Sequence, residues 1–171
     1  IGVLHHLEEP LAGWAVLTRL LRPDGLMKIG LYSETARRAM VAAQRWVAER
    51  QFPVTPDGIR AARRAILDLP MNHPARPSAV TLDFNSVSGF RDLVMHVQEH
   101  RFTTERLAEC LDQLGLRFLG FEVDRQIMRR FTTMLPEPGA HLDLTCWGQF
   151  EVAYPETFVS MYNLWCCPKQ G

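Results

Sequence analysis

Short apolar runs alternate with a helical repeat in the first part of the chain. Residues 1–4 and 26–32 are mostly apolar and predict short strands that are buried on both faces. Between them, apolar side chains recur at helical spacing and predict a helix over about 10–21. We expect Leu11, Trp14, Leu17 and Leu21 to form the inward face of this helix. Strand, helix and strand in this order predict a βαβ unit, and hence a parallel sheet with a right-handed crossover.

Helical periodicity dominates the middle of the chain. Ser33 can cap a helix over about 34–50, and Thr55-Pro56 predicts the start of a second helix. Residues 71–87 are richer in Pro, Asn and Ser and predict a loop, after which Ser88 can cap a further helix. Long loops in compact domains are often functional, so this loop is a candidate lid or insertion boundary.

The last third of the chain returns to strands. A helix over about 103–114, stopped by Gly115, precedes an apolar strand at 116–123. A short helix over 124–131 follows, and a final apolar strand spans 158–166. No internal repeat or linker divides the sequence, which predicts a single α/β domain.

Composition and charge exclude some classes of function. With 47% hydrophobic and 22% charged residues, the chain has the composition of a soluble globular protein. Lys+Arg and Asp+Glu number 19 each, so no basic surplus favours nucleic-acid binding. Neither a membrane-spanning apolar stretch nor a signal peptide is visible, which predicts a cytoplasmic protein. The four cysteines lack zinc-site spacing and are interpreted as reduced thiols.

Two segments near the start carry a resemblance to a known family. The first reads Gly2-Val3-Leu4-His5-His6-Leu7-Glu8-Glu9-Pro10. The second reads Leu20-Leu21-Arg22-Pro23-Asp24-Gly25-Leu26, and Tyr32-Ser33 ends the strand that follows it. Together they resemble the second half of a class I S-adenosylmethionine-dependent methyltransferase, where such segments accompany the fourth and fifth strands. Asp24 stands where that family usually has glycine.

The resemblance covers most of the chain and is loosest over 34–102. It implies a partial Rossmann-like methyltransferase sheet, with parallel strands, a C-terminal antiparallel hairpin formed by 116–123 and 158–166, and a helical cap or insertion. Residues 91–103 and 161–166 are more specifically similar to bacterial methyltransferases fused behind tetratricopeptide repeats. Such repeats are therefore implied upstream of this chain.

Part of that family's cofactor pocket has no counterpart in these 171 residues. A glycine-rich loop after the first strand and an acidic residue after the second are both missing. We therefore interpret the chain as the C-terminal half of one methyltransferase domain, inactive by itself. The resemblance leaves Gly2, Val3, Leu4 and His5 as candidates for binding S-adenosylmethionine.

A second motif, His96-Val97-Gln98-Glu99-His100, matches the H-x-x-E-H signature of inverted zinc peptidases. On a helix, His96 and His100 would share one face and could hold a metal, with Glu99 as general base. No convincing third ligand follows in the sequence. The same residues could equally form a substrate-pocket wall or part of the surface, and we predict no bound metal.

Methyl transfer requires that the acceptor lose a proton, and histidine titrates near neutral pH. The candidates for this side of the reaction are His6, Tyr32, His96, Glu99 and His100. Two alternatives stay open, a non-enzymatic methyltransferase-like interaction module and a zinc hydrolase.

Overall fold

The chain forms two compact units in its computed structural model, which describes residues 1–80, 82–95 and 99–169. Unit 1 combines Ile1–Ala36 with His100–Gly171, and unit 2 is Arg37–Glu99. The assignment of 1–171 to one domain with an insertion over 34–102 stays a prediction. None of the helices in the described part of the chain is long and apolar enough to cross a membrane.

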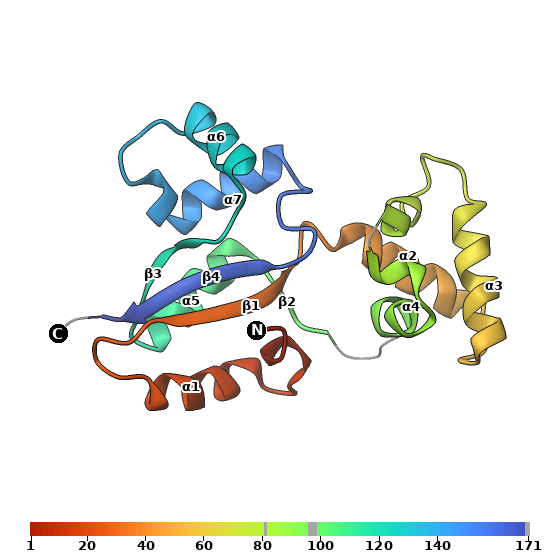
Figure 1. Ribbon diagram of the computed structural model, residues 1–171, viewed down its shortest axis with the longest axis horizontal. Helices are drawn as coiled ribbons and strands as arrows, with labels where there is room; N and C mark the ends of the chain where they lie inside the picture. The colour runs from red at the N-terminus through yellow and green to blue at the C-terminus, as the bar shows by residue number, and fades with distance from the viewer. Residues whose placement is uncertain (81, 96–98, 170–171) are drawn as a thin grey trace. The chain divides into compact units, whose positions relative to one another are not determined.

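Unit 1 is built on a four-stranded mixed sheet with the strand order β2-β1-β4-β3 (Figure 1). Its strands are β1 (Met27–Ser33), β2 (Arg101–Phe102), β3 (Leu116–Phe121) and β4 (Tyr162–Pro168). β1 runs parallel to β2 and antiparallel to β4, which is also antiparallel to β3. The α/β class and the C-terminal antiparallel hairpin are therefore confirmed.

The strand predicted for residues 1–4 is wrong. Gly2 has a φ of +74°, and Val3 has φ −118° and ψ −46°, so neither holds the extended conformation of a strand. A 3-10 turn, η1 (Leu4–His6), follows directly. The parallel neighbour of β1 is instead β2, through the pairs Tyr32–Arg101 and Ser33–Phe102. The predicted βαβ unit thus lacks its first strand.

After η1, the helices of unit 1 are α1 (Pro10–Leu20), α5 (Thr104–Gln113), α6 (Arg125–Met134), the 3-10 turn η4 (Ala140–Leu142) and α7 (Leu144–Ala153). Side-chain caps mark the start of three of them, α5, α6 and α7. Thr103, Asp124 and Asp143 each accept a hydrogen bond from the first turn of the helix that follows. α6 is longer than the helix expected over 124–131, and no prediction was made for α7.

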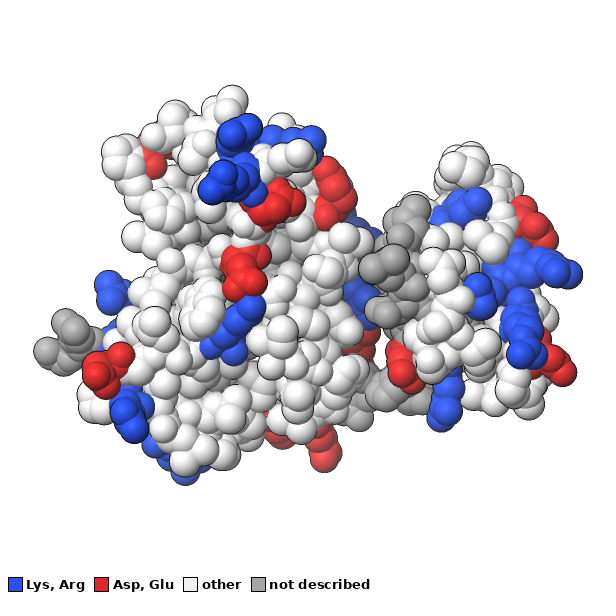
Figure 2. Space-filling model, viewed as in Figure 1, with Lys and Arg blue, Asp and Glu red and all other residues white. Residues whose placement is uncertain are grey.

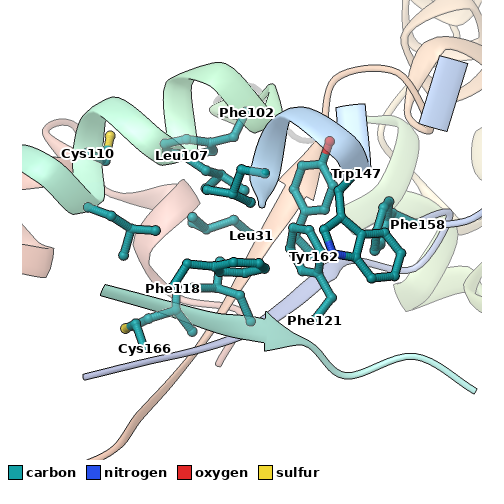
Figure 3. Packing of buried hydrophobic residues seen from close by; sticks show 14 of the residues in the cluster. Leu31, Phe102, Leu107, Cys110, Phe118, Phe121, Trp147, Phe158, Tyr162 and Cys166 are labelled. Atoms are coloured by element: carbon teal, nitrogen blue, oxygen red, sulfur yellow. The ribbon is translucent and has the colours of Figure 1, made fainter. Parts of the chain in front are cut away.

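An aromatic cluster joins α6 and α7 to the sheet, as Figure 3 shows for part of it. Trp147 of α7 stacks on Phe131 of α6 with ring centroids 4.0 Å apart and meets Phe121 of β3 edge-on at 5.3 Å. Tyr162 of β4 stacks on Phe121 at 5.1 Å. All four side chains are buried, so this cluster fixes the start of β4 against the helices.

Unit 2 is helical and has a hydrophobic core of its own. It contains α2 (Arg38–Glu49), α3 (Pro56–Leu67), the 3-10 turns η2 (Arg76–Val80) and η3 (Leu82–Asn85), and α4 (Val87–Val94). Three details of the prediction are wrong: α2 starts four residues late, 71–87 contains the two turns, and Ser86 rather than Ser88 caps α4. Figure 2 shows Lys and Arg side chains gathered over α3.

Candidate functional site at the carboxyl end of β1

Three predicted site residues meet at the carboxyl end of β1: His5 and His6 from the opening segment and Tyr32 from the strand itself. The 3-10 turn brings the ring of His5 to 4.0 Å from Tyr32 and 4.2 Å from His6. His5 is fully buried, whereas His6 is exposed and lies 6.3 Å from Tyr32, edge to face. The cluster therefore has a buried member that packs and an outer member that can reach a ligand.

His100 joins this cluster although it is far away in the sequence. Its backbone N–H donates to the carbonyl of His5 at 2.9 Å, and the next residue, Arg101, pairs with Tyr32 in the sheet. The His100 Nε2 atom is buried and has no hydrogen-bond partner among the described residues. Three of the five predicted catalytic candidates, His6, Tyr32 and His100, thus lie together with His5.

The other two candidates lie elsewhere. Helix α4 ends at Val94, so Glu99 and His100 are not on a helix, and the helical spacing that a zinc site needs is not formed. Both Glu99 oxygens accept from Arg37, at 3.1 Å from Nε and 2.5 Å from Nη2, and both side chains are buried. His96 lies outside the described residues. Within those residues, no group of three or more His, Cys, Asp or Glu side chains could hold a metal.

Three of the four predicted cofactor residues line a cavity of about 330 Å³. Gly2, Val3 and Leu4 form one wall; the other lining residues are Ile1, Leu7, Gly13, Leu17, Lys28, Ile29 and Gly30. The walls are almost entirely apolar, with the Lys28 side chain as the exception. His5 is not part of this lining and belongs to the aromatic cluster instead. The cavity can therefore hold an apolar group, while the histidines offer the polar chemistry.

A buried carboxylate, not predicted from the sequence, pins the end of β1 to the rest of unit 1. Glu151 of α7 accepts hydrogen bonds from the Ser33 hydroxyl through one oxygen and from the Tyr162 hydroxyl through the other. All three residues are at most 3% exposed. Burial, and then the neighbouring Glu151 charge, raise the pKa of the Tyr162 phenol far above its ordinary value. Ser33 also accepts from the Ala36 N–H at 2.9 Å, so the residue after Tyr32 is held from two sides.

The only sequence signal for this network is a single charged residue in a largely apolar stretch. Glu151 lies between Phe150 and Val152, and a lone acid of this kind can be either buried or on the surface. Its two hydroxyl partners are 118 and 11 residues away, so only the tertiary fold shows that the carboxylate is bonded.

Comparisons with known proteins support the fold and leave the activity open. No family model matches the chain. The uncharacterized protein syc1184_c of Synechococcus sp. is 34% identical over 128 residues, which are 71% of this chain and 30% of that protein. The structure of the methyltransferase PKMT2 from Rickettsia typhi matches 98% of this chain with a TM-score of 0.70 and 12% identity. A second PKMT2 structure, in complex with AdoHcy, matches 99% with the same score and identity.

The chain thus has a methyltransferase fold. It spans about a third of the length of these proteins, 34% and 35% for the two PKMT2 chains. At 12% identity the structural match establishes the shared fold alone, so substrate and activity depend on the residues of the site itself.

Proposed function

We propose that this chain is part of an S-adenosylmethionine-dependent methyltransferase, in which it contributes the second half of the catalytic domain. One observation carries the proposal: the rings of His5, His6 and Tyr32 lie together at the carboxyl end of β1, and the backbone of His100 bonds to His5, in a fold shared with PKMT2. In α/β sheets, ligands bind beyond the carboxyl ends of the strands. One PKMT2 structure is complexed with AdoHcy, the product that S-adenosylmethionine leaves after methyl donation.

The cofactor, S-adenosylmethionine, would supply the activated methyl group. We infer that Gly2, Val3 and Leu4 form its apolar wall, because they line the 330 Å³ cavity, and that His5 orders this segment by packing on Tyr32. A cavity of this size is at the lower limit for a complete small-molecule site. The remaining part of the pocket would come from further polypeptide, in agreement with the greater length of the matched proteins.

Two histidines are suited to take the proton that the methyl acceptor loses. His6 is exposed at the outer side of the cluster, and the His100 Nε2 has no hydrogen-bond partner among the described residues. A positioned histidine can act as a general base in such a step. Tyr32 packs against His5 and lies edge to face with His6. Glu99 is assigned a structural role because Arg37 occupies both of its oxygens. His96 stays a candidate without a structural argument.

AdoHcy binding provides the first test, and it is best measured by calorimetry on a chain that includes the polypeptide upstream of Ile1. We expect binding there and much weaker binding by residues 1–171 alone. Failure of the longer chain to bind AdoHcy would remove the methyltransferase proposal. It would then favour the alternative, a methyltransferase-like module with a non-enzymatic role.

Substitution of the histidines tests their role in the reaction once an acceptor is identified. His6→Ala or His100→Ala should lower kcat by about 10²-fold or more while AdoHcy affinity is retained, because a proton acceptor is lost and not a cofactor contact. His141→Ala is a matched control, since His141 is an exposed histidine of η4 outside the cluster. Equal kcat values for all three variants would exclude both histidines as the base.

The setting of the whole protein is part of the same proposal. The Synechococcus relative supports a bacterial protein, and the absence of a membrane-spanning helix among the described residues is compatible with a cytoplasmic one. Tetratricopeptide repeats upstream rest only on the resemblance of residues 91–103 and 161–166. Peptide sequencing by mass spectrometry of the protein purified from its natural source would show whether tetratricopeptide repeats precede residue 1.

A further inference from the structure

A cavity of about 540 Å³ lies within unit 2, outside the candidate site of unit 1. Its walls come from the last turns of α2, from the segment that follows α2, and from the end of α4. We call it the α2–α4 cavity. Its volume is in the range typical of sites that bind small molecules.

Most of the wall of this cavity is apolar and held in place by the core of unit 2. Val47 and Val94 are 4% and 3% exposed and belong to that core. Phe52 stacks on Trp46 with ring centroids 6.0 Å apart, and the Arg50 guanidinium lies 3.9 Å from the centroid of the Trp46 ring. The wall is therefore largely formed before a ligand arrives. Its apolar members are Val47, Phe52, Val54, Val94 and Met95.

Arg45 is the one charged side chain among the described residues that line the cavity. It is exposed, and it forms no ion pair with another described residue. The last carbonyl groups of α2 border the same space, but the partial charge of a helix end, about half a unit, is smaller than the full charge of a guanidinium. The electrostatics of the cavity therefore favour an anionic ligand.

Gln51 adds an amide to this wall at a conformational cost. Its φ is +52°, and among the described residues it alone has a positive φ without being glycine. Its N–H donates to the carbonyl of Ala48 at 3.1 Å, so it occupies the position after α2 where glycine is usual. A side chain in this conformation costs stability. Such residues cluster where a side chain contacts a ligand.

We propose that the α2–α4 cavity binds a small organic acid with an apolar chain. The chain lies against Val47, Phe52 and Val94, and the carboxylate accepts hydrogen bonds from the Arg45 guanidinium and the Gln51 amide. An inorganic anion would leave the apolar wall in water, and an uncharged apolar molecule would leave Arg45 without a counterion. This site lies wholly in unit 2 and is independent of the proposed methyl transfer.

Octanoate is the probe, octylammonium is its match of opposite charge, and acetate is the carboxylate without a chain. Calorimetry on residues 1–171 should give a dissociation constant on the order of 1 mM for octanoate. The constants for octylammonium and acetate should be larger by about tenfold or more, because each lacks one of the two kinds of contact. Equal affinity for octanoate and octylammonium would overturn the proposal.

Methyl resonances of ¹³C-labelled methionine locate the ligand. The Met95 methyl group should shift saturably with octanoate, because Met95 lines the cavity. Met71, which is 81% exposed and outside the lining, should not shift. Octanoate binding without a shift of Met95 would overturn the proposal. It would then favour the apolar cavity of unit 1, which has Lys28 in its wall.

A pair of arginine substitutions tests the carboxylate contact. Arg45→Gln should weaken octanoate binding about tenfold and leave octylammonium binding no weaker. Arg38→Gln is the matched control, because Arg38 is an exposed arginine of the same helix outside the cavity lining. Circular dichroism verifies that both variants are folded. Equal octanoate affinity of the two variants would overturn the proposal.

Gln51→Gly separates a role in the site from a role in ending the helix. Glycine adopts a positive φ without strain, so the variant should unfold at a higher temperature than the wild type. It should also bind octanoate several-fold more weakly, because the amide contact is lost. A higher unfolding temperature with unchanged octanoate affinity would overturn the assignment of Gln51 to the site.

Discussion

The two units use different means to hold their polar groups. In unit 1, the strands β1 and β4 and helix α7 bring Ser33, Tyr162 and Glu151 into one buried network. In unit 2, a buried ion pair joins Arg37 and Glu99, the first and last residues of the unit. The carboxylate–hydroxyl network of unit 1 fixes the end of β1 that carries the candidate site. The ion pair of unit 2 joins the two ends of its helical segment.

Removal of the central aromatic side chain of unit 1 should have the largest effect on stability. Trp147 is fully buried between Phe131 and Phe121, so Trp147→Ala leaves a large cavity and should cost about 3–5 kcal/mol of unfolding free energy. Urea unfolding followed by circular dichroism measures it. Exposed Trp165, on β4, offers the control Trp165→Ala, which should cost much less. Similar losses for both variants would contradict the assignment of Trp147 as the centre of the core.

Disruption of the ion pair in unit 2 should have the next largest effect. Arg37→Ala leaves the Glu99 carboxylate buried without its cation, which should cost about 3 kcal/mol. The side chains of this pair are 5% and 7% exposed, whereas those of Arg60 and Asp57 are 61% and 96% exposed. Arg60→Ala should therefore have little effect, since water solvates the remaining charge. The unfolding free energies of the two variants are compared by urea unfolding at one pH and salt concentration. Equal losses of unfolding free energy would contradict the stronger contribution expected of the buried pair.

Loss of one hydroxyl from the buried network of unit 1 should cost somewhat less. Tyr162→Phe removes one donor to the Glu151 carboxylate and should reduce stability by about 2 kcal/mol. The control, Tyr154→Phe, alters a half-buried tyrosine for which the structure shows no hydrogen bond of the hydroxyl to another described residue.

The same residue gives unit 1 a dependence on alkaline pH. The pKa of Tyr162 is raised in the folded protein from the ordinary value of 10.0, so above about pH 10 the unfolded chain releases this proton first. Stability therefore falls as pH rises through that range, and Tyr162→Phe should flatten the fall. Thermal unfolding between pH 8 and about 11 measures this fall in stability. Equal slopes of stability against pH for wild type and Tyr162→Phe would contradict Tyr162 as its cause.

The parts of unit 1 that sequence predicts well are those with local signals. β1, β3 and β4 are apolar runs bounded by turn residues, and Thr103, the N-cap of α5, marks the start of that helix in the sequence. Residues 1–4 show the limit of this approach. An apolar run is compatible with a strand, but Gly2 has a positive φ, and the segment lies over Gly30, where a side chain would collide with Met161 and Ile1.

The site was predicted in part for the same reason. His5, His6 and Tyr32 belong to segments with a family resemblance, and the structure brings them together. The position of His100 depends on β2, a two-residue strand too short for periodicity to reveal. α7 carries the exposed Val152 opposite the buried Trp147, so its apolar residues do not mark one face, and Glu151 was missed with it.

The smallest effect, and the sharpest comparison of the units, comes from two matched helix caps. Thr55 of unit 2 and Thr103 of unit 1 each accept a hydrogen bond at 3.2 Å, from the N–H of Gly58 and Arg106 respectively. Replacement of either by Ala should cost about 1 kcal/mol. If the units unfold separately, Thr55→Ala should speed hydrogen exchange only in α2–α4, and Thr103→Ala only in α5 and the sheet. Faster exchange in both units after either substitution would show that they unfold as one, because a local loss then lowers the stability of the whole chain.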